Sequence, residues 1–404
     1  MSFEFAFKHV SRYARGVARS GRPFVSGGAQ VGGSPRSATM RGRVVAHLLA
    51  GSWRAAPPLV DVDLSTLAEV TSLMGTLGVG GLAWWKLLHS GLGEVADAES
   101  ARRAYRADAI QAALHLHSIR VLVSRLRAAG IEPIVIKGWS TARLYPEPGL
   151  RPYVDLDLVV PPGLGASAET ILQDDGGVIC PDHADVLDAS TWTASGPHGP
   201  QGDLADHPWE AVRERSRLVA LGELRVRVLG PEDHLRLSAV HAFRHGFISP
   251  KWLCDIGLLV ERLPHDFDWS YCLAGDPRHT EQLLRTLGLA HHTLGADVHS
   301  CPGTAKEIPP WLSSSVFRRW GMPRVEGPGP SLLSGWRQPS KVRIELCRRW
   351  PDPLESTLRL GLGLTGHSRS AAQVCDFVWR FGILSAIRHL RRKTPLRVPR
   401  RYIT

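Results

Sequence analysis

The spacing of apolar positions along the chain predicts a helical stretch, a stretch of mixed period and a second helical stretch. Apolar residues recur at helical spacing over about 64–90 and over 97–129, and Gly130 is placed to end the longer helix. Helical spacing returns in the second half of the chain, with long helices predicted over 232–247 and 250–263 and further helices, broken by Pro and Gly, beyond them.

Between these stretches the period shortens to that of β-strands. Apolar or alternating runs predict strands at 132–136, 154–160 and 223–229, and helical spacing near 139–145 and 164–174 predicts helices among them. Because strands and helices mix only in this central part, the expected fold class is α+β, with a small core between two helical regions. The predicted organisation is a basic disordered tail (1–40), an N-terminal helical region (41–130), the α/β core (131–230), a C-terminal helical region (231–390) and a second basic tail (391–404).

The net charge of +11 at pH 7 belongs to the two ends of the chain. Residues 1–44 carry eight Lys or Arg and one acid, and residues 388–404 carry seven Lys or Arg and no acid, which leaves 34 basic and 37 acidic residues between them. Such tails could contact RNA, acidic lipid or an acidic partner. Solvated termini are the simpler interpretation.

Cysteine usage and hydropathy favour a cytoplasmic protein. The six cysteines are scattered without a Cys-x-x-Cys pair, which is typical of neither a zinc site nor a disulfide framework. The basic N-terminus has no clean apolar core, so no secretory signal is expected. No run of about 20 uncharged apolar residues is present, so no membrane-spanning helix is expected.

Two aspartates stand inside an otherwise apolar strand pattern, Val154-Asp155-Leu156-Asp157-Leu158-Val159-Val160. Side chains alternate faces along a strand, so Asp155 and Asp157 are expected on one face, roughly 7 Å apart at Cα. Carboxylates in an apolar strand are costly unless they are paired or bind metal. Two carboxylates at this spacing can hold a pair of divalent cations, and a solvated edge strand is the alternative.

Lys137-Gly138 follows a predicted strand and precedes a predicted helix. A glycine at this place lets a phosphate approach the backbone, and the helix N-terminus offers free N–H groups and a positive dipole. Ser140 adds a hydroxyl donor, so these three residues are expected to bind phosphate; an exposed lysine at a strand end is the alternative. Arg151, in the turn before Asp155, could contact phosphate or hold the turn by pairing with a carboxylate.

A two-metal site usually includes a third carboxylate, which can also take the proton from an attacking hydroxyl. In the stretch HADVLDASTW, Asp188 is the preferred candidate and Asp185 the reserve, and either could be only a loop acid. Another alternating pair, Asp61 and Asp63, lacks the upstream Lys-Gly loop and runs into a helix start. Asp63 is therefore predicted to be a helix N-cap.

Polar residues on the two predicted helices after the core are better explained by packing and ion pairing than by metal binding. His241 and His245 are four residues apart, as in many metal sites, but no acid or cysteine completes a ligand set, so packing or phosphate contact is preferred. Asp255 lies in an apolar helical pattern. It is expected to have a buried partner such as His245 or Arg244.

Together these residues resemble the DNA polymerase β-type nucleotidyltransferase superfamily. More narrowly, the chain resembles an uncharacterised nucleotidyltransferase group that reads Lys-Gly, then Tyr-Pro-x-Pro-Gly-x-Arg, then an Asp-x-Asp strand. The matching residues are Lys137-Gly138, Tyr145-Pro146-Glu147-Pro148-Gly149-Leu150-Arg151 and Asp155-Leu156-Asp157. Further on, PEDHLRLSAVHAFRHG and KWLCDIGLLVER resemble the C-terminal helices of that group. The resemblance covers about residues 60–265.

The resemblance implies a small mixed-sheet nucleotidyltransferase core that moves a nucleotidyl group from an NTP to a hydroxyl-bearing acceptor and releases pyrophosphate. It implies Mg²⁺ or Mn²⁺ held by Asp155 and Asp157, and ATP as the expected nucleotide. Asp188 would complete the catalytic site, and the nucleotide would be bound by Lys137, Gly138, Ser140 and Arg151.

The acceptor is expected to be a small molecule, a peptide or a protein. Members of the group often occur among genes for modified-peptide (RiPP, including lasso peptide) or other natural-product assembly. One alternative is a catalytically silent nucleotide-binding or partner-binding module, suggested by the imperfect match at the third carboxylate. Another is an RNA-associated protein that uses its basic tails.

Overall fold

A computed structural model gives the structure of the protein. It describes residues 35–173, 184–188, 206–301, 308–322, 350–360, 362, 364 and 368–379. Residues 1–34 of the first predicted basic tail and all of the second, 391–404, therefore lie outside the described residues. A helix begins at Pro35, however, within the stretch predicted to be a tail.

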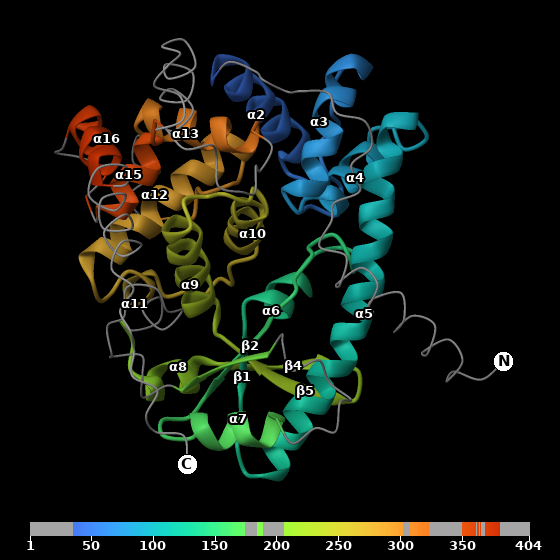
Figure 1. The fold of residues 1–404 in the computed structure, drawn as a ribbon. Helices are drawn as coiled ribbons and strands as arrows, with labels where there is room; N and C mark the ends of the chain where they lie inside the picture. The colour runs from blue at the N-terminus through green and yellow to red at the C-terminus, as the bar shows by residue number, and fades with distance from the viewer. Residues whose placement is uncertain are drawn as a thin grey trace, which may run out of the picture. The chain divides into compact units, whose positions relative to one another are not determined.

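The described strands form one mixed sheet of five strands in the order β3-β2-β1-β5-β4 (Figure 1). β1 is antiparallel to β2 and parallel to β5, β2 is parallel to β3, and β4 is antiparallel to β5. The predicted α+β class with a small mixed sheet is confirmed. The strands are β1 (Ile134–Ile136), β2 (Leu156–Val160), β3 (Ala184–Asp188), β4 (Arg217–Leu221) and β5 (Leu224–Val228).

Helices cover both faces of the sheet. On one face, side chains of α5 (Glu99–Ala128) and α7 (Gly165–Gln173) pack with Val135, Leu158 and Val226. On the other, α8 (Trp209–Arg215) and α9 (Pro231–Arg244) pack against Ile134, Ile136 and Val159. Alternation along each strand sends successive apolar side chains to these two cores. The sequence patterns did not reveal β4 or α8.

The N-terminal helices are α2 (Pro35–Leu49), α3 (Leu64–Thr76), α4 (Gly80–His89) and α5, preceded by a short 3-10 turn, η1 (Ala96–Ala98). The single helix expected over 64–90 is two helices, because Gly78 adopts φ +69° between them. Asp63 caps α3 as predicted, with its carboxylate accepting a hydrogen bond from the Thr66 N–H at 2.9 Å.

The C-terminal helices share one hydrophobic core with α2, α3 and α4. Trp53, Leu82, Phe247, Leu258 and Trp320 are all buried in it. The helical stretches on the two sides of the α/β core in sequence therefore fold against each other. These C-terminal elements are α9, α10 (Lys251–Val260), α11 (Trp269–Cys272), α12 (Pro277–Leu294), α13 (Pro310–Trp320), α15 (Pro353–Arg359) and α16 (Arg369–Val378).

None of the helices in the described ranges combines the length and the apolar character needed to cross a membrane.

Candidate active site

The Lys137-Gly138 loop forms the tight connection between β1 and the short helix α6 (Gly138–Ala142). Both residues have positive φ, +49° at Lys137 and +28° at Gly138, so the backbone here is strained for a lysine and favours glycine. A Cβ on Gly138 would lie 2.9 Å from the carbonyl oxygen of Asp155 and 3.4 Å from the Tyr153 ring. The glycine therefore lets this loop lie directly against the backbone of Asp155.

The two aspartates lie at the same edge of the sheet as this loop. Asp157 is the Cα partner of Ile136, the last residue of β1, and Asp155 immediately precedes β2. Because β1 and β2 are antiparallel, the end of β1 and the start of β2 meet. Asp155 is exposed and Asp157 is half-buried. The strand is shorter than the predicted 154–160, and Val154, expected to be buried, is 63% exposed.

The register of β2 and β3 separates the two candidates for a third carboxylate. Asp185 is the Cα partner of Asp157, and Asp188 is the partner of Val160. Three residues along a strand correspond to about 10 Å, so Asp188 lies well away from the edge at which Asp157 stands. The strand register therefore favours Asp185 as the third carboxylate, whereas the sequence pattern favoured Asp188.

The hydroxyl groups of α6 are engaged inside the protein. Ser140 is fully buried, and its hydroxyl donates to the Lys137 carbonyl at 2.8 Å. Thr141 Oγ1 lies 2.8 Å from His234 Nε2 on α9. Burial lowers the pKa of His234 to about 4, and the positive charge of Arg143 acts in the same direction. Ser140 thus stabilises the strained loop, where a phosphate contact had been predicted.

Arg151 occupies a buried ion pair with Asp255 on α10. Its Nη2 donates to Asp255 Oδ2 at 2.8 Å, and its Nε lies 3.2 Å from both carboxylate oxygens. The Tyr145 hydroxyl donates to Asp255 Oδ1 at 2.8 Å. Of the two roles considered for Arg151, the structure supports pairing with a carboxylate. The partner expected for Asp255, His245 or Arg244, is thereby corrected to Arg151 and Tyr145.

Lys251, the first residue of α10, belongs to this neighbourhood although no pattern marked it as a site residue. Its Nζ donates to the Pro152 carbonyl at 3.3 Å. Burial lowers the pKa of Lys251 to about 8, as does the charge of Arg151, while Asp255, Asp108 and Asp155 act in the opposite direction. The sequence feature that could have drawn attention to Lys251 is the scarcity of lysine, since the chain contains only seven lysines.

The two histidines at metal-like spacing form an aromatic cluster with Trp252. The ring centroids of His241 and His245 are 4.5 Å apart, and each lies within 5.4 Å of the Trp252 ring. Of the two roles preferred for these histidines, packing and phosphate contact, this geometry is consistent with packing.

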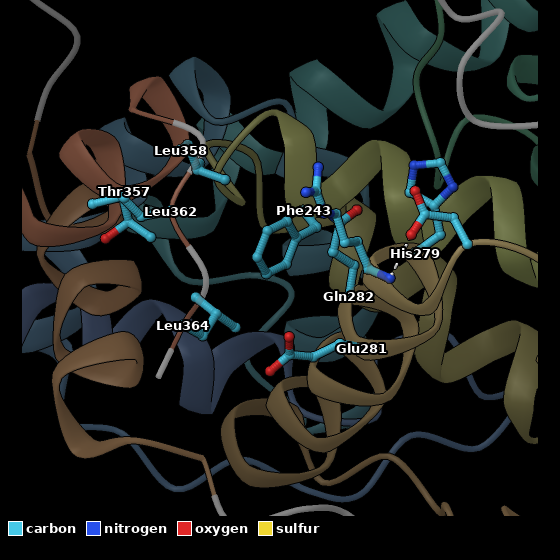
Figure 2. A pocket seen from close by; sticks show the side chains of 10 residues that line it. Phe243, His279, Glu281, Gln282, Thr357, Leu358, Leu362 and Leu364 are labelled. Carbon is cyan, nitrogen blue, oxygen red and sulfur yellow. Dashed lines mark hydrogen bonds between the residues drawn. The ribbon is translucent and has the colours of Figure 1, made fainter. Parts of the chain in front are cut away.

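A separate cavity of about 500 Å³ lies among α9, α12 and α15 (Figure 2). Phe243, Leu358 and Leu362 give it an apolar side, and His279 and Glu281 give it a polar side. His279 is already paired with Asp206 at 2.7 Å. None of the predicted site residues lines this cavity.

The small mixed sheet, with a Lys-Gly loop and two aspartates at one edge, is the arrangement that the resemblance to nucleotidyltransferases implies. A family described as "Uncharacterised nucleotidyltransferase" matches residues 65–295, more than half of the chain. The chain belongs to this family. No curated protein matches it. A solved structure of an antigenic nucleotidyltransferase-like protein from Paracoccidioides brasiliensis is similar at 19% identity and a TM-score of 0.32, covering 45% of this chain and 93% of that one.

Proposed function

We propose that the protein transfers a nucleotidyl group from an NTP to a hydroxyl group of an acceptor and releases pyrophosphate. The observation that supports this most directly is the contact between the Lys137-Gly138 loop and the backbone of Asp155. It brings a cation and a glycine together with the Asp155 and Asp157 carboxylates at one sheet edge. Phosphate recognition and divalent-metal chemistry need groups of these kinds.

The donor chemistry of the site fits Mg²⁺ or Mn²⁺. Asp155 and Asp157 offer carboxylate oxygens, the ligands that these hard cations prefer. Among the side chains that the structure describes, no group of three His, Cys, Asp or Glu is arranged to hold a metal, and the side chains of β3 are not among them. The register makes Asp185 the best candidate. A bound metal would neutralise charge on the phosphates during in-line displacement.

The reaction forms a bond between the acceptor oxygen and the α-phosphorus and breaks the bond from that phosphorus to the bridging oxygen of the β-phosphate. The acceptor hydroxyl loses a proton, and in this proposal Asp185 accepts it, in the role first considered for Asp188. Pyrophosphate leaves with the electrons of the broken bond. Lys137 and the N–H groups near Gly138 would stabilise its charge.

The substrates remain the ones that the family resemblance suggested. ATP is the proposed nucleotide, and the proposed acceptor is a small molecule, a peptide natural product or a protein. Ser140 contributes indirectly, because its hydrogen bond to the Lys137 carbonyl holds the loop in its strained conformation.

The test is pyrophosphate release from each of the four NTPs with Mg²⁺ or Mn²⁺, in the presence of candidate acceptors or cell lysate. Asp155→Ala and Asp157→Ala are each expected to lower the rate by at least about 100-fold. Asp61→Ala is the matched control, because Asp61 is an exposed aspartate in the similar pattern Val-Asp-Val-Asp. Asp185→Ala and Asp188→Ala decide between the two candidates for the third carboxylate.

Two results would count against this proposal. Unchanged release after both Asp155→Ala and Asp157→Ala would remove these residues from the chemistry. Nucleotide binding without release, across all acceptors tried, would favour the catalytically silent module.

A further inference from the structure

The segment from Arg151 to Asp155 is held at two points. At its end, the Asp155 carbonyl lies against Gly138, close enough that any larger residue would clash. At its start, α10 contacts the segment twice, through the Arg151–Asp255 ion pair and through the Lys251 hydrogen bond to the Pro152 carbonyl. The first residue of α10 is therefore anchored to the backbone that carries Asp155.

Three carboxylates, those of Asp255, Asp108 and Asp155, favour the positive charge of Lys251, and they differ in which other groups they contact. Asp255 is already occupied by Arg151 and Tyr145. Asp108, on α5, is largely desolvated, and burial raises its pKa to about 6. Asp155, the third of these carboxylates, is exposed and is a metal ligand in the proposed function.

Binding of a metal-nucleotide complex changes this balance. Asp155 and Asp157 would hold the divalent cation, which would offset the negative charge that Asp155 offers to Lys251. The polyphosphate bound with the metal would supply negative charge in its stead. The Lys251 ammonium group, hydrogen-bonded to the Pro152 carbonyl three residues before Asp155, could donate hydrogen bonds to phosphate oxygens bound near Asp155.

We propose that Lys251 binds the phosphates of the nucleotide, which makes α10 of the C-terminal helical region a part of the nucleotide site. The inference rests on the proposed function. It adds a second cation, from a different part of the chain, to Lys137. It also gives the Arg151–Asp255 pair a positioning role, because this pair fixes α10 relative to the Asp155 segment.

The first experiment measures binding of ATP with Mg²⁺ to the full-length protein by equilibrium dialysis. Lys251→Met is expected to weaken binding at least about tenfold, and Lys251→Arg to stay within about threefold of the parent because it keeps the positive charge. Lys86→Met is the matched control. Lys86 is a buried lysine whose pKa, like that of Lys251, is lowered by burial to about 8, and its Nζ donates to the Ala50 carbonyl in the helical core.

The second experiment needs no variant and so does not depend on folding of a mutant. The unaltered protein is acetylated briefly with and without ATP and Mg²⁺, and modification of each lysine is measured by peptide mass spectrometry. Nucleotide is expected to protect Lys137 and Lys251 and to leave Lys86 unchanged. Protection of Lys137 without protection of Lys251, or unweakened binding by Lys251→Met, would overturn this inference and leave the proposed function standing. Absence of binding of all four NTPs by the unaltered protein would overturn both.

Discussion

Replacing Asp255 with asparagine is expected to destabilise the fold strongly, because the substitution leaves the Arg151 guanidinium buried without a counter-charge. The two side chains are almost inaccessible, with Asp255 3% and Arg151 7% exposed. They meet through donors at 2.8 and 3.2 Å, and the Tyr145 hydroxyl adds a third contact at 2.8 Å. Asparagine has nearly the same shape and can still accept from Tyr145, so the main change is the lost charge.

The size of the effect follows from burial. Removing one partner of a buried ion pair costs about 3–5 kcal/mol, because the other charge remains desolvated. For a chain of this size the free energy of unfolding falls by about 3 kcal/mol per molar urea, so the urea concentration at the midpoint of unfolding should fall by about 1–1.7 M. Replacing both partners, as Arg151→Met with Asp255→Leu, removes both charges and should recover most of the loss.

Urea unfolding at pH 7, followed by tryptophan fluorescence, measures this effect. Arg103→Gln is the control, since Arg103 is exposed and only 3.9 Å from Glu99, and such a pair contributes about 0.3–0.5 kcal/mol. A loss below about 1 kcal/mol in Asp255→Asn would refute the reasoning.

Three further predictions concern the loop and its neighbour His234. Gly138→Ala should cost about 1–3 kcal/mol in thermal unfolding, because its Cβ would meet the Asp155 carbonyl at 2.9 Å; unchanged stability would show that the loop can move aside. Lys137→Gly should raise the free energy of unfolding by about 1 kcal/mol, because glycine adopts φ +49° without strain, and it should also weaken ATP binding. Unchanged stability would contradict the assigned strain, and unchanged ATP affinity would contradict the assigned role in binding. The pKa of about 4 for folded His234, against 6.5 for a free histidine, means that the unfolded chain binds the proton first. Stability should therefore fall by up to about 3 kcal/mol as pH drops from 6.5 to 4, and His234→Gln should flatten this part of a urea-derived stability profile, whereas the exposed His265→Gln should not.

Local sequence patterns were sufficient to predict features whose contacting residues are close together in the sequence. Asp63 was predicted as a helix cap because its partner, Thr66, is three residues away. The long α5 helix and its end near Gly130 follow from apolar spacing and from a glycine with φ +79°. The Lys137-Gly138 loop was predicted for the same reason, since a strand, a glycine and a helix follow one another directly.

Contacts between distant segments were decided by the tertiary structure. Arg151 had two possible roles in the sequence, and its partner Asp255, 104 residues further on, supports one of them. Lys251 lies near the Asp155 segment because α10 contacts that segment in the folded chain, and no local sequence pattern predicts this contact.

The sequence by itself determined the residue types of the site and the small α/β core, because strand alternation and the Lys-Gly loop are local properties of the backbone. Only the tertiary structure decided which aspartate of β3 is in register with Asp157. Asp185 and Asp188 lie about 10 Å apart along one strand in similar sequence contexts, and the register of β3 on β2 pairs Asp185 with Asp157 and Asp188 with Val160. That register depends on the packing of the whole sheet against its helices, so it is a property of the folded chain.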